Sequence, residues 1–164
     1  MDIKQSSLIC GFTLLELLLV VSIIGLLSMA ALFSSWQGTN INLAGQAEQL
    51  ANDIRYAQSL AMTKGQRYRW VETSSTTYQI QNNSGTAIIL AQGNTTVTLS
   101  SGITFGTLTN LPNSLINFDG TGTPYSNTTA PGAALSANAI IPMIAGNRTL
   151  TIVVAAGTGG VSVP

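Results

Sequence analysis

Gly11-Phe12-Thr13-Leu14-Leu15-Glu16 opens the stretch that decides the fold, because it leads directly into an apolar run from Leu17 to Phe33. As a helix, residues 12–33 would be about 33 Å long, which matches the hydrocarbon core of a bilayer. Glu16 stands at the start of this run, and an isolated carboxylate near hydrocarbon costs about 2.5 kcal/mol or more. That cost makes Glu16 a candidate functional residue.

The segment from Gly11 to Gly25 resembles the cleavage and methylation signal of type IV pilins and of the pseudopilins of type II secretion systems. The resemblance implies that a prepilin peptidase cuts after Gly11 and that the new amino terminus on Phe12 is N-methylated. It also implies that Glu16 pairs with the Phe12 amine of a neighbouring subunit and sets the axial register of a filament. A buried ion pair suits this task, since it specifies geometry better than it stabilises.

Other kinds of amino-terminal segment fit this sequence less well. A secretory signal peptide carries its apolar core before the cleavage site, whereas here the apolar run follows the proposed cut. Cys10 lacks the features of a lipoprotein site, because no apolar segment precedes it and Ile9 is not small. An ordinary signal anchor with a stray glutamate is the remaining alternative.

Cleavage after Gly11 would remove Cys10, the only cysteine of the chain. The mature chain would then form no disulfide and would have no thiolate nucleophile or cysteine-based metal site. Many major pilins close their carboxyl-terminal region with a disulfide, so the resemblance favours a minor subunit.

The length and composition of the chain indicate one membrane-anchored domain that carries little charge. About 130 residues follow the apolar run, enough for a single hydrophobic core. The whole chain has 6 basic and 6 acidic residues, and from Ser74 onward only Asp119 and Arg148 are formally charged. Such a surface has weak self-repulsion and weak electrostatic steering. It favours packing beside other subunits over binding a polyanion.

A second helical pattern occupies residues 38–65. Apolar or small residues at intervals of three and four form one stripe, made of Leu43, Ala47, Leu50, Ile54, Ala57 and Ala61. The stripe predicts a helix that packs on a sheet, with Gly65 as its carboxyl-terminal cap. The segment from Ala51 to Gly65 looks like the helix end of the GspH/FimT branch of pseudopilins.

After Gly65 the pattern alternates, which predicts an antiparallel β-rich head over residues 66–164. Residues 123–139 are predicted to be a loop, and Ile116 to Gly122 is similar to a strand and glycine turn of the same branch. The candidate strands are Gln66–Thr73, Thr77–Gln81, Ala87–Ala91, Thr95–Leu99, Ile103–Phe105, Leu115–Phe118, Thr149–Val154 and Val161–Val163.

The expected fold is α+β and pilin-like, with a long amino-terminal spine helix packed on an antiparallel β-sheet head. Its expected parts are a leader peptide (1–11), a transmembrane helix (12–37), the amphipathic second half of the spine helix (38–65) and a periplasmic head (66–164).

Residues suited to catalysis are scarce, and we expect no enzymatic activity, cofactor or metal. The chain has no histidine, and no two carboxylates have the spacing of a general acid and base. The segment 119–123 resembles a calcium loop, but it supplies one carboxylate where such sites use several. A plain Asp-Gly turn is the preferred interpretation. Arg67 and Arg69 share one strand face, opposite Tyr68 and Trp70, and form a candidate interaction surface.

The resemblance identifies the chain as a minor pilin-like subunit of a type II secretion pseudopilus or a type IV pilus, supporting protein secretion or pilus biogenesis. It implies a single pass through the bacterial inner membrane. The implied partners are other pilin or pseudopilin subunits, the prepilin peptidase and an inner-membrane assembly platform.

A DNA-binding minor pilin for natural transformation and a major pilin are the alternatives. Members of the branch that bind DNA resemble one another in a carboxyl-terminal Gly-Arg-X-Arg motif. The corresponding segment here reads Gly159-Gly160-Val161-Ser162 and has neither arginine. This difference disfavours a nucleic acid partner.

Overall fold

The computed structural model describes residues 13–127 and 132–164, with the backbone alone for residues 29–41. The chain divides into two compact units, Met1–Gly38 and Thr39–Pro164. One long helix, α1 (Leu14–Lys64), contributes to both units. Within the described part of the chain, no helix is both long enough and apolar enough to cross a membrane.

The predicted helix stripe is confirmed. All six of its residues are at most 2 % exposed, and Ala51 joins them in the core of the second unit. The helix ends at Lys64, and Gly65 follows with φ of +61°. A left-handed residue just past the last turn is the usual glycine cap, so the predicted helix end is also confirmed.

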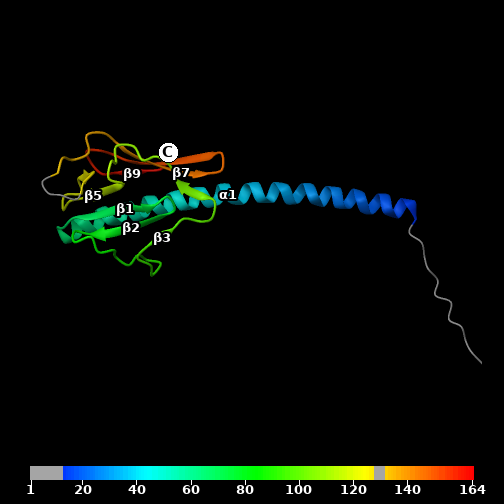
Figure 1. Cartoon of the computed structure of the whole chain (residues 1–164), viewed down its shortest axis with the longest axis horizontal. Coiled ribbons are helices and arrows are strands. Elements are labelled where there is room, and N and C mark those ends of the chain that lie inside the picture. Colours follow the sequence, from blue (N-terminus) through cyan, green and yellow to red (C-terminus); the bar gives the residue numbers. More distant parts are fainter. Residues whose placement is uncertain (1–12, 128–131) are drawn as a thin grey trace, which may run out of the picture. The chain divides into compact units, whose positions relative to one another are not determined.

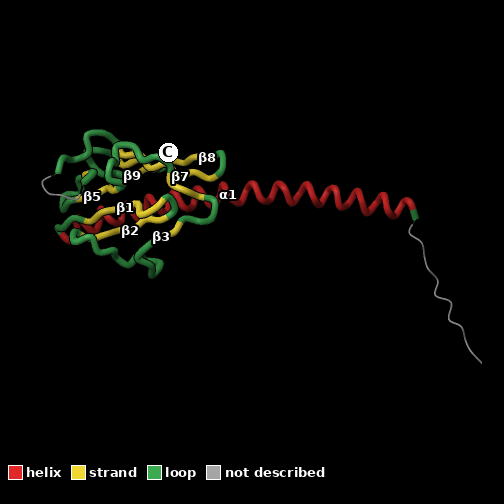
Figure 2. Tube along the Cα trace, viewed as in Figure 1, coloured by secondary structure: helices red, strands yellow, loops and turns green. Residues whose placement is uncertain are grey.

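The strands of the head form two antiparallel sheets around the carboxyl-terminal part of α1 (Figures 1 and 2). The first sheet has the order β3-β2-β1-β5-β6. Its strands are β1 (Tyr68–Ser74), β2 (Thr77–Asn82), β3 (Val97–Thr98), β5 (Leu115–Phe118) and β6 (Pro124–Tyr125). Trp70 lies at its centre, opposite Ile80 on β2 and Ile116 on β5. All three side chains are fully buried.

The second sheet has the order β4-β7-β8-β9. Its strands are β4 (Ile103–Phe105), β7 (Ala139–Ala145), β8 (Arg148–Val154) and β9 (Val161–Ser162). Alternate residues of β7 are buried, as expected for a strand with one face on a core. Phe105 of β4 packs edge-on against Trp70 and Tyr78 of the first sheet, with ring centroids 5.8 and 6.1 Å apart. Both sheets therefore share one core with the helix stripe.

Two of the strand predictions are wrong. The segment Ala87–Ala91 forms no strand, and it meets β2 only at the isolated bridge between Gln81 and Ala87. The segment 123–139, predicted as a loop, contains β6. The other candidate strands are present, with ends that differ by at most two residues from the predicted ones.

The strand β7 has no counterpart among the predicted strands, because Pro142 interrupts its apolar pattern and proline usually marks an edge or a strand end. The Pro142 carbonyl accepts a hydrogen bond from the Gly106 amide, just past the end of β4. In an antiparallel strand, the N–H and C=O of one residue point to the same side. Proline has no N–H to donate, and at Pro142 that N–H would point to the side of β4 but beyond its last residue, Phe105. No strand hydrogen bond is therefore lost.

Candidate functional site

Glu16 lies in the first turn of α1, and the structure reveals how that turn is capped. The Glu16 amide donates to the Thr13 hydroxyl oxygen over 3.3 Å and to the Thr13 carbonyl over 3.0 Å. Thr13 is thus the N-cap and Glu16 the third helical residue, which is the spacing of a capping box. The Thr-X-X-Glu pattern could have revealed this cap from sequence. Gly11 and Phe12 lie outside the described residues.

The Glu16 side chain is exposed within an apolar surface. Leu14, Leu15 and the large apolar residues from Leu17 to Leu27 are also exposed, several by more than 60 %. Contiguous apolar surface of this kind marks a site of contact with protein or membrane. A carboxylate inside such a surface needs a cationic partner once the surface is covered, because an unpaired charge is costly to desolvate.

Arg67 and Arg69, the candidate interaction surface, both contact side chains of the head. Arg69 Nε donates to Gln81 Oε1 on β2 over 2.9 Å. Arg67 lies just before β1, and its guanidinium carbon is 4.5 Å from the centre of the Tyr125 ring, within the range of a cation–π contact. Trp70, predicted on the strand face opposite the arginines, is fully buried, and Tyr68 is partly buried against the core. A role of the two arginines in binding a partner stays a prediction.

The Asp119 segment is a turn that joins β5 to β6. Asp119 Oδ1 accepts hydrogen bonds from the amides of Thr121 and Thr123 and from the Thr121 hydroxyl, and Oδ2 accepts from Tyr125. Burial acts to raise the Asp119 pKa, but these hydrogen bonds favour the carboxylate and lower the pKa overall. The carboxylate thus has partners inside the turn, as the Asp-Gly interpretation predicted.

A contact between three distant segments was missed from the sequence. Gln58 of α1 donates from Nε2 to the carbonyls of Gly122 and Thr158, each over 2.9 Å. Gly159 has φ of +67°, and a Cβ atom there would lie 2.6 Å from Gln58 Nε2 and 2.7 Å from the Gly122 oxygen. Only glycine fits this position without displacing its neighbours. Gly159 therefore has a packing role, and no local pattern identifies it.

Asp53 forms a second polar contact that the sequence did not reveal. Its Oδ2 accepts a hydrogen bond of 2.6 Å from the Tyr78 hydroxyl of β2. Burial raises the Asp53 pKa, and the Tyr78 hydrogen bond offsets part of the rise. Burial and the same hydrogen bond raise the pKa of Tyr78. The helix pattern placed Asp53 off the buried stripe, but the Tyr78 side chain of β2 reaches Asp53 at that position.

The two aspartates predict opposite effects of pH on the stability of the head. The Asp53 pKa in the folded state lies above its ordinary value of 3.8, so its contribution to the free energy of unfolding is greatest below pH 3.8 and falls as pH rises through the raised value. The Asp119 pKa is lowered from 3.8, so its contribution is present above pH 3.8 and is lost as pH falls through the lowered value.

We therefore expect Asp53→Asn to gain stability relative to the wild type as pH rises through the acidic range. Asp119→Asn, the matched control, should lose stability relative to the wild type over the same titration. Urea unfolding followed by circular dichroism at a series of acidic pH values measures both differences. Parallel curves for the wild type and Asp53→Asn would contradict the assignment of a raised pKa to Asp53.

Comparison with known proteins gives one family and a set of related folds. A family model described as type II transport protein GspH matches residues 46–159. No curated protein sequence matches the chain. The matched region contains the buried stripe of α1 from Ala47 onward, both sheets except β9, and the Gln58–Gly159 contact.

Solved structures of two pilin-like proteins are similar to the chain. The type IV minor pilin FimU of Pseudomonas aeruginosa (strain PAO1) has 14% sequence identity and a TM-score of 0.53, over 76% of this chain and 90% of that chain. The minor pseudopilin EpsH from the type 2 secretion system of Vibrio cholerae has 8% identity and a TM-score of 0.52, over 75% of this chain and 96% of that chain. At such low identities the likeness concerns the fold, and it confirms the pilin-like α+β architecture.

Proposed function

The chain belongs to the GspH family of type II transport proteins, and from this premise we propose how it joins a filament. Members of the family are minor pseudopilins of type II secretion, structural subunits without enzymatic activity that assemble with other pseudopilins. We propose that Glu16 pairs with the N-methylated amine of Phe12 on a neighbouring subunit. The pair sets the axial position of each subunit as it leaves the membrane.

The observation that carries this proposal is the exposed carboxylate of Glu16 among exposed leucine, isoleucine and valine side chains. Burial of this surface in lipid or in a helix bundle removes the water that solvates the carboxylate. The neighbouring amine then offers the missing charge, because peptidase cleavage before Phe12 creates a cation four residues from Glu16. A buried carboxylate without such a partner is strongly unfavourable.

The proposal also assigns a place to each part of the chain. Residues 1–11 are the leader removed by the prepilin peptidase, and residues 12–37 hold the subunit in the bacterial inner membrane. Residues 38–65 complete the spine helix, and residues 66–164 form the periplasmic head. An inner-membrane assembly platform then draws the subunit into the pseudopilus. The apolar surface from Leu14 to Leu27 supports this arrangement, since it needs lipid or other helices to cover it.

Gly11→Val should block maturation, because the residue before the cut must be small enough to enter the peptidase site. The variant should keep its leader, while the wild type expressed beside an active prepilin peptidase should begin at methylated Phe12. Mass spectrometry of the chain purified from membranes distinguishes the two. Ser7→Val, which introduces the same side chain elsewhere in the leader, serves as the control and should be processed normally. A wild-type chain that still begins at Met1 would contradict the proposed processing.

A further inference from the structure

The apolar segment Ala87–Ala91 lies along the outer side of β2, away from β1 (Figures 1 and 2). The Ile88 amide donates to the Ile80 carbonyl of β2 over 2.8 Å. Ala87 forms an isolated antiparallel bridge with Gln81 of the same strand. The segment therefore begins a further strand of the first sheet but does not complete it.

Two residues of this segment present unpaired backbone groups. In an antiparallel strand the N–H and C=O of one residue point to the same side, and the sides alternate along the chain. Ile88 directs its amide to β2, so the backbone groups of Ala87 and Ile89 point away from the sheet. No hydrogen bond joins Ala87 or Ile89 to any residue of the described chain. Alternate residues of a strand are about 7 Å apart, which is the spacing that a further strand would match.

The side chains of the segment divide between the core and the solvent. Ile88 packs against the core, and Leu90 is buried. Ile89, on the other face, is 68 % exposed, more than any other large apolar side chain in the described part of the second unit. An exposed apolar side chain beside unpaired backbone groups is typical of a sheet edge that pairs with another chain.

The sequence around this edge lacks the usual protection against pairing. Proteins commonly place lysine or another charged residue, or proline, on an exposed edge strand. No charged residue occurs from Thr73 to Phe118, and no proline occurs from Thr73 to Leu111. The edge is therefore open to a further strand.

The other sheet edges are covered by the chain itself. At β9, Arg55 Nη2 donates to the Val161 carbonyl over 2.8 Å. At β4, the Phe105 amide donates to the Ser75 carbonyl over 2.8 Å. The last residue of β6 forms a bridge with Ala134. Each of these edges thus has a partner within the protein.

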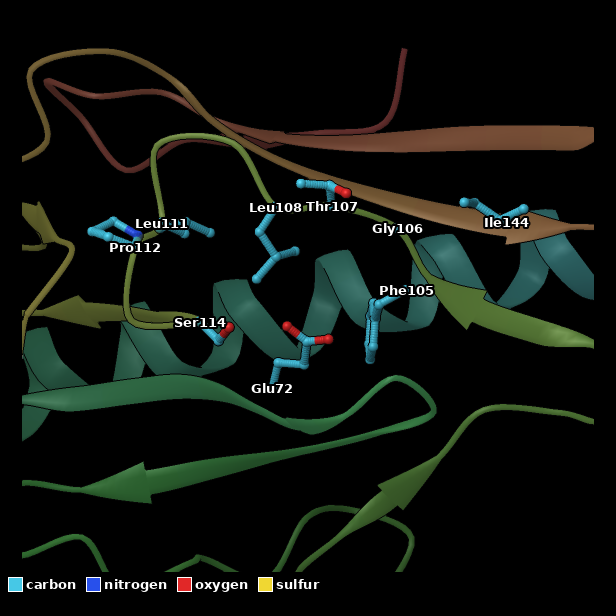
Figure 3. Close-up of a pocket in the computed structure, with 9 residues that line it drawn as sticks. All are labelled: Glu72, Phe105, Gly106, Thr107, Leu108, Leu111, Pro112, Ser114 and Ile144. Atoms are coloured by element: carbon cyan, nitrogen blue, oxygen red, sulfur yellow. The ribbon is translucent and has the colours of Figure 1, made fainter.

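The loop before β5 covers the part of β1 that β5 does not reach. Its Ser114 carbonyl accepts a hydrogen bond from the Glu72 amide over 2.9 Å. Figure 3 shows Leu108 of the same loop pointing towards the Glu72 carboxylate. The edge at Ala87 and Ile89 has no such cover within the described chain.

We propose that the edge at Ala87 and Ile89 receives an extended, uncharged segment of a different pseudopilin, which adds a strand to the first sheet. The inference deepens the proposed function and rests on it, because the GspH family assembles with other pseudopilins. Backbone groups that alternate along an extended segment bind another extended segment by strand addition. The edge has no charge to pair with a charged side chain, which would be costly to desolvate. The residue that meets Ile89 should be β-branched or aromatic, since such cross-strand pairs stabilise sheets.

Photo-cross-linking tests the contact in the full chain, expressed with the other pseudopilins of its secretion system, each carrying its own tag. p-Benzoylphenylalanine in place of Ala91, which is exposed two residues from Ile89, should give a product that carries the tag of one other pseudopilin. The same amino acid in place of Asn147, exposed in the turn between β7 and β8, serves as the control. Its products should not change when the edge is altered.

A backbone variant shows whether strand pairing carries the contact. Ala87→Pro removes the N–H that points away from the sheet and leaves the Ile88 hydrogen bond to β2 in place. It should reduce the product about tenfold, equivalent to about 1.4 kcal/mol. Ala87→Ser keeps the N–H and should cross-link as the wild type does.

A side-chain variant tests the same edge by a different route. Ile89→Lys places a charge on the edge, as natural edge strands do to prevent pairing, and should also reduce the product about tenfold. Gln92→Lys, the matched control, places the same charge in the exposed turn that follows and should leave the product unchanged. Thermal unfolding followed by circular dichroism should show both lysine variants to be as stable as the wild type, because both positions are exposed.

The fraction of chain recovered in sheared filaments separates this inference from the proposed function. Normal recovery without a tagged product at Ala91 would overturn the edge contact and leave the proposed function intact. A product with a second copy of this chain, or one that is insensitive to Ile89→Lys, would overturn it as well. Failure of the wild-type chain to enter filaments would contradict the proposed function, and the inference would fall with it.

Discussion

Glu16→Ala should leave the chain in the membrane with a folded head and reduce its incorporation into filaments by about two orders of magnitude. Breaking a buried ion pair by removing one partner costs about 3–5 kcal/mol, and each 1.4 kcal/mol is about a tenfold change in equilibrium. Membrane residence does not suffer, because removal of a carboxylate from an apolar segment also removes a desolvation cost. The measurement compares membrane-fraction levels with recovery in sheared filaments.

Two further variants separate the charge of Glu16 from its place in the helix cap. Glu16→Gln keeps a side chain that can close a capping box but loses the charge, so it should fail in assembly as Glu16→Ala does. Thr13→Val removes the capping hydroxyl and keeps the charge, so it should assemble. Normal incorporation of Glu16→Ala would reject the pairing with Phe12. Loss of the variant from the membrane fraction would indicate that Glu16 acts before assembly.

Ile54→Asp should unfold the head. Ile54 is fully buried in the helix stripe that both sheets cover, and a charge placed there without a partner costs several kcal/mol. Domains of this size are stable by only about 5–15 kcal/mol. In a chain that begins at Asn40, we expect the wild type to be a soluble monomer with mixed helix and strand signals in circular dichroism. The variant should lose the cooperative thermal transition.

Ser59→Asp is the matched control for this substitution. It introduces the same side chain on the same helix, at an exposed position off the stripe, where surface changes usually shift stability by less than about 0.5 kcal/mol. Its thermal transition should coincide with that of the wild type. An Ile54→Asp variant that unfolds at the wild-type temperature would show that the helix stripe does not form the core.

The elements that the sequence predicted are those whose pattern lies within a few consecutive residues. The stripe from Leu43 to Ala61 repeats at helical spacing, and Gly65 follows it where a left-handed cap is needed. The strands from β1 to β5 alternate or carry short apolar runs between turn residues, and Ala87–Ala91 is the segment where this local signal misled. In each correctly predicted element, the residues that are buried recur at the spacing of a helix or a strand. A short segment of sequence is therefore enough to predict the element.

Contacts between segments that are distant in the sequence could be found only from the tertiary structure. Pro142 fits inside β7 because β4 ends at Phe105, opposite Met143, so no residue of β4 lies opposite Pro142. Gly159 is required by Gln58, about a hundred residues before it, and the hollow lined by Glu72, Leu108 and Ser114 depends on a loop folded over β1. No local pattern encodes these contacts, because each arises only when the sheets close around the helix. The sequence by itself thus determined the helix stripe and the pilin-like fold class. The packing of the two sheets decided which polar groups are enclosed and which remain available to another subunit.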